Sequence, residues 1–378
     1  MTKKILILGA GVMQVPIICK ALEMGFETIV VDYDKNAPGF KYATKKYLVS
    51  TLDQDAILNI AKLENISGII TTSDAPVRVV AHVGKNLGLP TMSERVSEIC
   101  TDKFAQRNLF KTSGINCPEF FLCDASTNLD EFKEFPYIVK PIDSSASRGV
   151  TKVRNKEELN FALKDALQFS KKGKAIIESF IPGREFSVET LTQNLKTEII
   201  TITEKLTKGE SDGYFVEDTH IQPARITTEE YDLIKQEVKS ALQAIGVDNC
   251  PTHTEIKINA HGAYIIEIAC RLGGDYITSD LVPLSTGVDM LENLIKIAIG
   301  EPINTATIYE KNSAVQFINP ENYNNCKQYI DSHIDEIIRY EISPYKDKPI
   351  KNSMDRLGYI ILQSNDMIHL ENELKKIK

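Results

Sequence analysis

The chain has 378 residues, of which 42% are hydrophobic and 25% charged, so we expect a soluble globular protein of two or three domains. The formal net charge of −8 argues against a nucleic acid or an anionic membrane as a partner. Seven scattered cysteines without a CxxC pair argue against a disulfide framework or a zinc site, and they favour a cytoplasmic location.

The first 95 residues show strands and helices in alternation. Residues 3–32 predict a strand, a glycine turn, a helix and a second strand, and we interpret the N-terminal apolar run as that first strand rather than as a signal peptide. A helix over 54–64, a strand over 68–72 and a helix ending before Pro90 continue the pattern. This order predicts a small doubly wound domain with a parallel sheet.

Two ligand-binding signals in this domain are weak. The turn Gly9-Ala10-Gly11 follows a strand, as in dinucleotide-binding proteins, but Gln14 occupies the third glycine position of that motif, so nicotinamide binding is disfavoured. Asp74 follows the strand over 68–72. It is a candidate for ligand binding at the sheet edge, and equally for capping the next helix.

The middle of the chain has a second candidate for anion binding. A strand over 137–141 carries Lys140, a loop of small residues follows at 142–150, and a returning strand comes next. Hydroxyls, backbone N–H groups and Arg148 in this loop favour a phosphate cover, although such a loop is more often an ordinary turn. It is not a Walker loop, because GxxxxGK[ST] occurs nowhere in the sequence.

Antiparallel strands are predicted between residues 175 and 222. They are interrupted by a polar stretch at 207–218 that we interpret as a candidate mobile loop, and His220 follows it. An amphipathic helix then begins after Thr227 or Thr228 and ends at Gly246. Beyond residue 310 the pattern is mixed, and the last residues predict a surface helix.

The most informative stretch is HTEIKINAHGAYIIEIACRLGGD at 253–275. Its two alternating runs predict a hairpin with the three-residue loop Ala260-His261-Gly262, in which Gly262 is left-handed. In that register Glu255 lies directly opposite Glu267, with Cβ atoms roughly 4.5–5.5 Å apart. The alternative is that both glutamates lie on a solvated face, and the flanking isoleucines argue against this.

Two bare carboxylates at that distance repel each other, and one would have to hold its proton. A divalent cation removes the conflict, and magnesium prefers oxygen ligands completed by substrate phosphates. Arg271 follows four residues after Glu267, so the hairpin predicts a metal site beside a fixed cation.

The order of these motifs resembles the ATP-grasp superfamily over nearly the whole chain. The motifs are TDK at 101–103, YIVKP at 137–141, the SSASRGV loop, ESFIPGREFSVE at 178–189, HTEIK at 253–257 and EIACRLGGD at 267–275. The last is similar to the carboxylate–amine ligase branch, including the L-amino-acid ligases. Relatives such as biotin carboxylase carry Asn-Pro where this chain has Ala269 and Cys270, so a third metal-shell oxygen is not evident.

The resemblance implies an α/β fold, α+β in parts, with three domains. A Rossmann-like domain would cover 1–95, and an ATP-grasp domain 96–310, with a small lid at about 115–180 and an antiparallel metal-binding sheet. A C-terminal segment, 311–378, would pack on the ATP-grasp domain.

The resemblance also implies three sets of site residues. Those for ATP would be Lys103, Lys140, Ser144, Ser145, Ser147, Arg148, Gly149, Glu178, Ser179, Phe180, Ile181 and Glu185. Those for Mg²⁺, or alternatively Mn²⁺, would be Glu255 and Glu267. Those for the substrates would be Asp74, His220, His253, Arg271, Gly273 and Gly274, with Arg271 and Lys140 catalytic. A single histidine such as His220 more often has a structural or solvent-exposed role than a substrate-binding one.

The implied activity is ATP-dependent joining of a small carboxylate, such as an amino acid, to an amine. An acyl phosphate would form, and ADP and phosphate would be released. Two alternatives are a bicarbonate-using enzyme similar to carboxyaminoimidazole ribonucleotide synthetase and a nucleotide-binding regulator without turnover. A homodimer is expected, because dimers are common among relatives.

Overall fold

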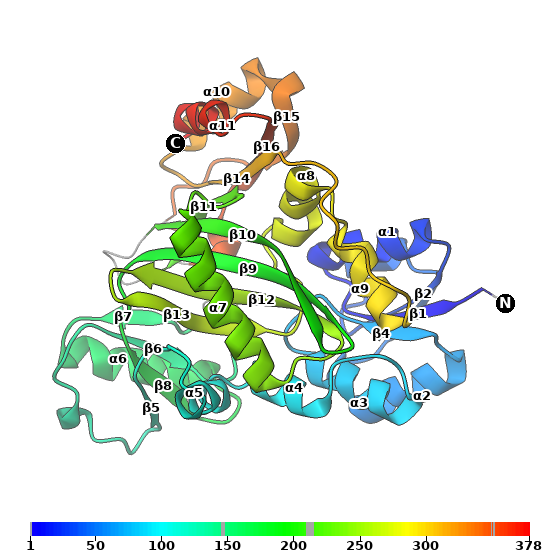
Figure 1. Cartoon of the computed structure of the whole chain (residues 1–378), viewed down its shortest axis with the longest axis horizontal. Helices are drawn as coiled ribbons and strands as arrows, with labels where there is room; N and C mark the ends of the chain where they lie inside the picture. Colours follow the sequence, from blue (N-terminus) through cyan, green and yellow to red (C-terminus); the bar gives the residue numbers. More distant parts are fainter. Residues whose placement is uncertain (1, 145–147, 209–214, 349, 351) are drawn as a thin grey trace.

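The structure is a computed structural model, and it describes residues 2–144, 148–208, 215–348, 350 and 352–378. Three sheets divide the molecule into lobes (Figure 1). The predicted Ser145 and Ser147 lie outside the described residues. None of the helices within the described ranges is both long enough and apolar enough to cross a lipid bilayer.

The N-terminal lobe is a parallel four-stranded sheet covered by helices on both faces. Its strands, in spatial order, are β3 (Lys45–Leu48), β2 (Glu27–Asp32), β1 (Lys4–Leu8) and β4 (Gly68–Ile70). Side chains of β1 alternate between two cores: Ile5 and Ile7 pack with α1, whereas Leu6 and Leu8 pack with α2 and α3. These helices are α1 (Val15–Glu23), α2 (Gln54–Glu64) and α3 (Val77–Leu87). The predicted doubly wound lobe is therefore confirmed.

The second sheet is small and antiparallel. Its strands, in spatial order, are β5 (Phe120–Cys123), β8 (Ala175–Ser179), β6 (Tyr137–Pro141) and β7 (Thr151–Val153). The helix α6 (Lys156–Phe169) packs on it through Leu159, Ala162 and Ala166. Two helices, α4 (Glu94–Cys100) and α5 (Lys103–Thr112), lead into this sheet from the first lobe.

An eight-stranded sheet forms the centre of the molecule. Its strands, in spatial order, are β13 (Gly262–Ala269), β12 (Cys250–Asn259), β9 (Arg184–Gln193), β10 (Lys196–Lys208), β11 (Val216–Gln222), β14 (Asn312–Ile318), β16 (Gly358–Ser364) and β15 (Ile337–Ile342). The C-terminal segment supplies the last three strands. The predicted antiparallel sheet is thus present and larger than the sequence indicated.

One face of the large sheet is apolar, and the other carries charges. The helix α7 (Thr228–Ile245) crosses the apolar face (Figure 1), capped by Thr227 and ending at Gly246 as predicted. Strand alternation sends Ile256 and Ile258 toward this helix, so Glu255 and Lys257 point to the opposite face.

The remaining helices lie in the C-terminal third. They are α8 (Val282–Thr286), α9 (Met290–Ala298), α10 (Tyr323–Ser332) and α11 (Met367–Lys376). The predicted terminal helix, α11, buries Leu370 and Leu374 against α10, β14 and β16. The α9 helix packs on α1 and β4 and ties the N-terminal lobe to the rest.

Candidate active site

Glu255 and Glu267 lie directly opposite each other on β12 and β13, as predicted. The predicted three-residue loop is wrong, because Asn259 pairs with Gly262 across a two-residue turn. A β-bulge between the turn and the glutamates adds Ile266, and this restores the opposed register. A regular ladder from the two-residue turn would instead put Ile266 opposite Glu255. Gly262 has φ +141°, which is not the helical left-handed position.

The helix α5 holds the bulge from the edge of the sheet. Arg107 donates a hydrogen bond to the carbonyl of Ile266. Gln106 accepts from the backbone N–H of Ile268 and donates to its carbonyl, both at 2.9 Å. Because β13 is an edge strand, these side-chain bonds replace a neighbouring strand and fix the register of Glu267.

Each of the two opposed carboxylates contacts a lysine. Lys103 donates to Glu267 at 2.7 Å, and Lys205 donates to Glu255 at 2.7 Å. The glutamate side chains remain 30% and 28% exposed, respectively, so both can reach a ligand in the pocket. Among the described residues, no three His, Cys, Asp or Glu side chains form a preformed metal cage. Two carboxylates facing one cavity fit magnesium whose remaining ligands come from phosphate and water.

Lys205 was not predicted from the sequence. It is buried, and its ammonium lies 2.7 Å from Glu255, 3.2 Å from Glu185 and 3.6 Å from Glu217. Burial opposes its charge, but the three carboxylates outweigh burial and raise the pKa of Lys205 well above its usual value. Its position between β9 and β11 brings these groups together, and strand order is not visible in a sequence.

On the small sheet, Glu178 lies between two cations. Lys140 and Arg107 each come within 2.8 Å of its carboxylate, and all three side chains are buried. Burial favours the protonated acid, but the positive charges of Arg107 and Lys140 outweigh it and lower the pKa of Glu178. Arg107 therefore links this ion cluster to the bulge of β13.

Arg271 bridges two lobes. Its guanidinium donates to both oxygens of Asp74, at 2.6 and 3.1 Å. Burial opposes the ionised form of Asp74, yet Arg271 lowers the pKa of this carboxyl. The capping alternative for Asp74 is wrong, because α3 has Pro76 as its N-cap and no side-chain cap bond.

Next to Arg271, His253 lies 2.6 Å from the buried Glu189 through Nδ1. Burial disfavours the imidazolium, but Glu189 outweighs this and raises the pKa of His253 to about 9. A Cβ on Gly273 would lie only 2.7 Å from Nδ1 of His253, so this position requires glycine for space.

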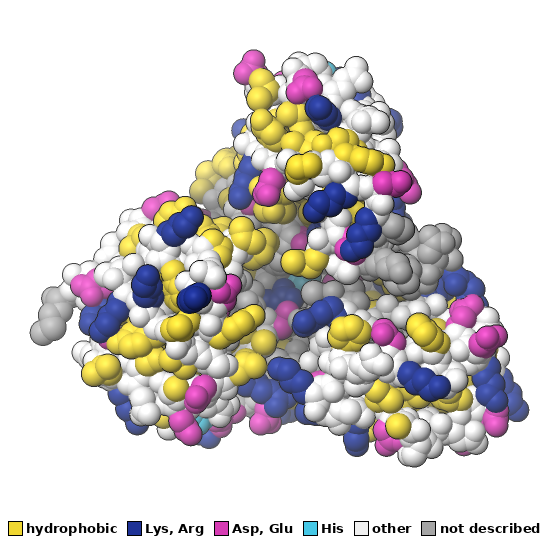
Figure 2. Space-filling model, turned by 180° about the vertical axis from the view of Figure 1, so that it is seen from behind, with side chains coloured by type: hydrophobic (Ala, Val, Ile, Leu, Met, Phe, Trp, Pro, Cys, Tyr) yellow, Lys and Arg dark blue, Asp and Glu magenta, His cyan; other side chains and the backbone are white. Residues whose placement is uncertain are grey.

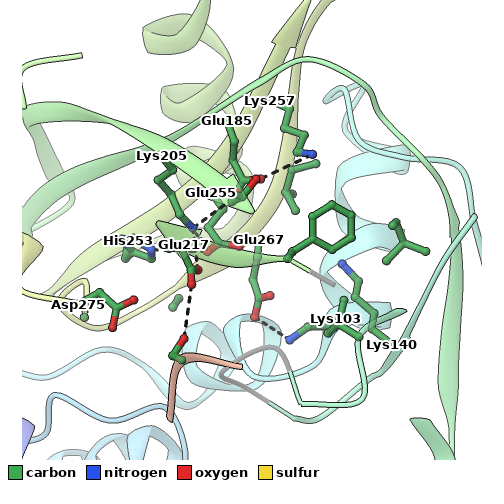
Figure 3. A pocket seen from close by; sticks show the side chains of 18 of the residues that line it. Lys103, Lys140, Glu185, Lys205, Glu217, His253, Glu255, Lys257, Glu267 and Asp275 are labelled. Atoms are coloured by element: carbon green, nitrogen blue, oxygen red, sulfur yellow. Dashed lines mark hydrogen bonds and ion pairs between the residues drawn. The ribbon is translucent and has the colours of Figure 1, made fainter. Parts of the chain in front are cut away.

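These groups line one cavity of about 390 Å³ between the three lobes. Viewed from behind, the lobes surround a hollow in which charged side chains are visible (Figure 2). Lysines and carboxylates from the small and large sheets point into it (Figure 3). The predicted residues that line it are Asp74, Lys103, Lys140, Ser144, Glu178, Ser179, Phe180, Ile181, Glu185, His220, His253, Glu255, Glu267, Arg271 and Gly274.

Of the predicted residues that the structure describes, three are not part of this lining. Gly273 packs behind the wall against His253, and Arg148 and Gly149 follow Ser144 in the loop without reaching the cavity. Lining residues that the sequence did not single out include Lys205, Phe215, Glu217, Lys257, Asp275 and Met354. Ala269 lines the cavity and Cys270 is buried, and neither side chain carries the oxygen that Asn would supply.

Family models match two parts of the chain. One describes an ATP-grasp domain and matches residues 133–280, and the other describes a PylC-like N-terminal domain and matches residues 5–87. Residues 133–280 of this chain are an ATP-grasp domain. The resemblance deduced from the motif order is therefore confirmed, and so is the α/β architecture that it implied.

Curated relatives are distant. A formate-dependent phosphoribosylglycinamide formyltransferase from Bacillus subtilis is 26% identical over 65% of this chain and 65% of its own length. The enzyme with the same name from Sulfurisphaera tokodaii is 30% identical over 58% of each chain. These matches leave about a third or more of each relative unmatched.

Solved structures share the fold over the full length. An L-amino acid ligase from Bacillus licheniformis has a TM-score of 0.82 at 21% identity and covers 100% of this chain and 97% of its own. The N5-carboxyaminoimidazole synthetase from Staphylococcus aureus, solved with ADP, has a TM-score of 0.80 at 16% identity, covering 100% and 98%. At such identities these structures establish the architecture and not the substrate.

Proposed function

We propose that this ATP-grasp protein is an ATP-dependent ligase that joins a carboxylate to an amine through an acyl phosphate and releases ADP and phosphate. One observation carries the proposal. The opposed carboxylates Glu255 and Glu267 face the same cavity as Lys103, Lys140 and Arg271. That set of charges suits the transfer of a phosphoryl group, which needs alignment and neutralisation more than covalent help.

ATP would bind between the small and large sheets. The cavity wall there is apolar, with Phe180 and Phe215 stacked 6.4 Å apart, and this suits a planar base. Glu185 lies next to this wall and is a candidate for the ribose hydroxyls. Lys103 and Lys140 would contact the phosphates.

Glu255 and Glu267 would hold Mg²⁺, which neutralises phosphate charge when it is bound. Lys103 holds the carboxylate of Glu267 in place, and Lys205 holds that of Glu255. Lys205 also keeps Glu255 ionised, because its positive charge raises the cost of protonating that carboxyl. The pKa of Glu255 is lowered well below its usual value, since Lys205 and His253 outweigh the effect of burial.

The reaction would proceed beside Arg271. A carboxylate is a poor electrophile, and transfer of the γ-phosphoryl group to one of its oxygens creates a leaving group. The amine nitrogen then attacks the carbonyl carbon, the C–O bond to phosphate breaks, and the nitrogen loses a proton. Arg271, held by Asp74, would stabilise negative charge on the acyl oxygens. Displacement of water from the cavity by the bound substrates would limit hydrolysis of the intermediate.

A one-carbon acid is the second candidate for the carboxylate. The curated relatives are named as formate-dependent enzymes, and several structural neighbours are N5-carboxyaminoimidazole synthetases. Formate- or bicarbonate-dependent ATP hydrolysis without any response to amino acids would favour this alternative.

The test is phosphate release from ATP by the pure protein with Mg²⁺. Pools of L-amino acids and of other carboxylates and amines would be added, with formate and bicarbonate as separate samples. We expect phosphate release that requires both a carboxylate and an amine. Tight ATP binding without release under any condition would contradict the proposal and indicate a regulator. Light scattering on the same sample checks the expected homodimer.

A further inference from the structure

One end of the cavity is closed by the C-terminal segment, far along the sequence from every ATP-grasp motif. Ser353 and Met354, in the short helical turn η7 (Ser353–Asp355), line the cavity. Met354 is 91% exposed, although it belongs to a cavity wall. An exposed methionine at the mouth of a cavity offers a deformable apolar contact to a ligand.

Arg356 fastens this turn to the cavity. Its guanidinium donates to Asp275 at 2.9 Å, to the carboxylate of Glu217 at 2.9 Å and to the carbonyl of Glu217 at 3.0 Å. The side chain is 8% exposed, and its guanidinium lies 3.6 Å from the centre of the Phe317 ring. Ser353 also donates to Glu217, at 3.4 Å.

Both acidic partners of Arg356 line the cavity. Glu217 and Asp275 lie at the end away from Lys140 (Figure 3). Asp275 and Tyr276 have φ of +50° and +64°, a left-handed backbone that non-glycine residues rarely adopt. Tyr276 is packed on Tyr359, with ring centres 4.1 Å apart, and Arg356 holds Asp275. These contacts keep the strained pair in place, four residues after Arg271.

We infer that the turn carrying Met354 is the specificity-determining wall of the substrate site, and that Arg356 is the positioning residue that holds this wall against Glu217 and Asp275. Met354 contacts an apolar group of the substrate that lies beyond the reacting carboxylate or amine. The substrate that carries this apolar group is therefore larger than a one-carbon acid. This inference rests on the proposed ligase function.

The experiment uses the full chain and a size series of L-amino acids: glycine, alanine, leucine and phenylalanine. KM and kcat are measured by phosphate release, with ATP and each amino acid varied in turn. We expect Met354→Ala and Met354→Trp to shift the ratio of kcat/KM for phenylalanine over alanine in opposite directions, each by about 10-fold or more, as expected for one pocket contact. The KM for ATP should change less than about twofold, since the turn lies away from the nucleotide.

Arg356→Met preserves the apolar stem over Phe317 and removes the bonds to both carboxylates. We expect it to raise the KM for the amino acid about 10-fold or more and to leave the KM for ATP unchanged, whereas Arg356→Lys should recover part of the loss. The control is Arg225→Met. Arg225 also pairs with two carboxylates, those of Glu204 and Glu371, and none of these three side chains lines the cavity.

The outcomes separate the two proposals. No phosphate release by the wild-type protein with any carboxylate and amine would overturn the ligase proposal and this inference with it, and release with formate or bicarbonate but with no amino acid would overturn this inference alone. Turnover by the wild type together with an unchanged size preference in both Met354 variants would overturn the inference alone. An equal rise in the KM values for ATP and amino acid in Arg356→Met, matched by Arg225→Met, would show a merely structural role and would also overturn it.

Discussion

Three lysine–glutamate pairs face the same cavity, and the pair of the small sheet differs from the two of the large sheet in burial. In the small sheet, the side chains of Lys140 and Glu178 are 6% and 3% exposed, and Arg107 adds a second cation. In the large sheet, Glu255 and Glu267 are 28% and 30% exposed, and each has one close lysine. The charges of the buried cluster are already paired with one another, although Lys140 and Glu178 still border the cavity. We expect the exposed carboxylates, in contrast, to exchange a lysine contact for a metal ion.

The largest effect should follow from removing an exchangeable carboxylate. We expect Glu267→Gln to lower turnover at least about 1,000-fold, because losing even an outer partner of a metal site costs about 10–100-fold. Phosphate release measures this effect. The fold should survive, and Glu198→Gln, at an exposed site on β10, is the control. Turnover within about twofold of the wild type would remove Glu267 from the metal site.

The buried cluster should respond in stability instead. We expect Arg107→Met to lower the free energy of unfolding by about 3–5 kcal/mol, because the variant loses one cation from a buried carboxylate. The variant also frees the carbonyl of Ile266. Urea denaturation measures the loss, and the double variant Arg107→Met/Glu178→Gln should recover part of it. A single variant as stable as the wild type would show that Lys140 alone suffices for Glu178.

The pair His253–Glu189 predicts a pH dependence. The folded-state pKa of His253, about 9, exceeds the usual value of 6.5. The folded protein therefore binds more protons than the unfolded chain between these values, and stability should fall as pH rises from 6.5 to 9. The loss is at most about 3 kcal/mol. Urea denaturation at pH 6, 7.5 and 9, without nucleotide or metal, measures it. The slope should flatten in His253→Gln; an equal slope in both proteins would contradict this assignment.

The smallest effect concerns adjacent glycines. A Cβ at position 273 would lie 2.8 Å from Glu189, whereas a Cβ at position 274 meets nothing within 4 Å. We expect Gly273→Ala to destabilise the fold by about 1–3 kcal/mol, as overpacking does. Gly274→Ala should stay within about 1 kcal/mol of the wild type. Thermal unfolding compares the two, and equal melting temperatures would contradict the close packing behind Arg271.

The sequence predicted what local patterns encode. Caps and apolar periodicity placed α2 and α7 within a residue of their ends, and alternation placed Glu255 opposite Glu267. The predicted three-residue loop was wrong, because a two-residue turn and a β-bulge produce that register. The bulge is held by Arg107 from a distant helix, which a local pattern does not show. The assigned roles of the individual site residues stay predictions.

The rest of the cavity depends on which strands become neighbours. Lys205 and Glu217 meet through the pairing of β10 with β11, and Arg356 reaches Glu217 because the C-terminal strands complete the same sheet. A periodic pattern shows which residues share a face of one strand, but it does not show which strand lies beside it.

The extra residue in β13 also breaks the strict alternation of sides along that strand. Ile266 lines the cavity together with its neighbour Glu267. An apolar and a charged side chain therefore lie next to each other in the cavity wall, where a regular strand would place only one of two successive side chains on that face. Removing Ile266 would leave the two acids facing each other while taking away the hydrocarbon surface beside them. A one-residue deletion would therefore separate the contribution of the opposed carboxylates to ligand binding from that of the apolar surface beside them.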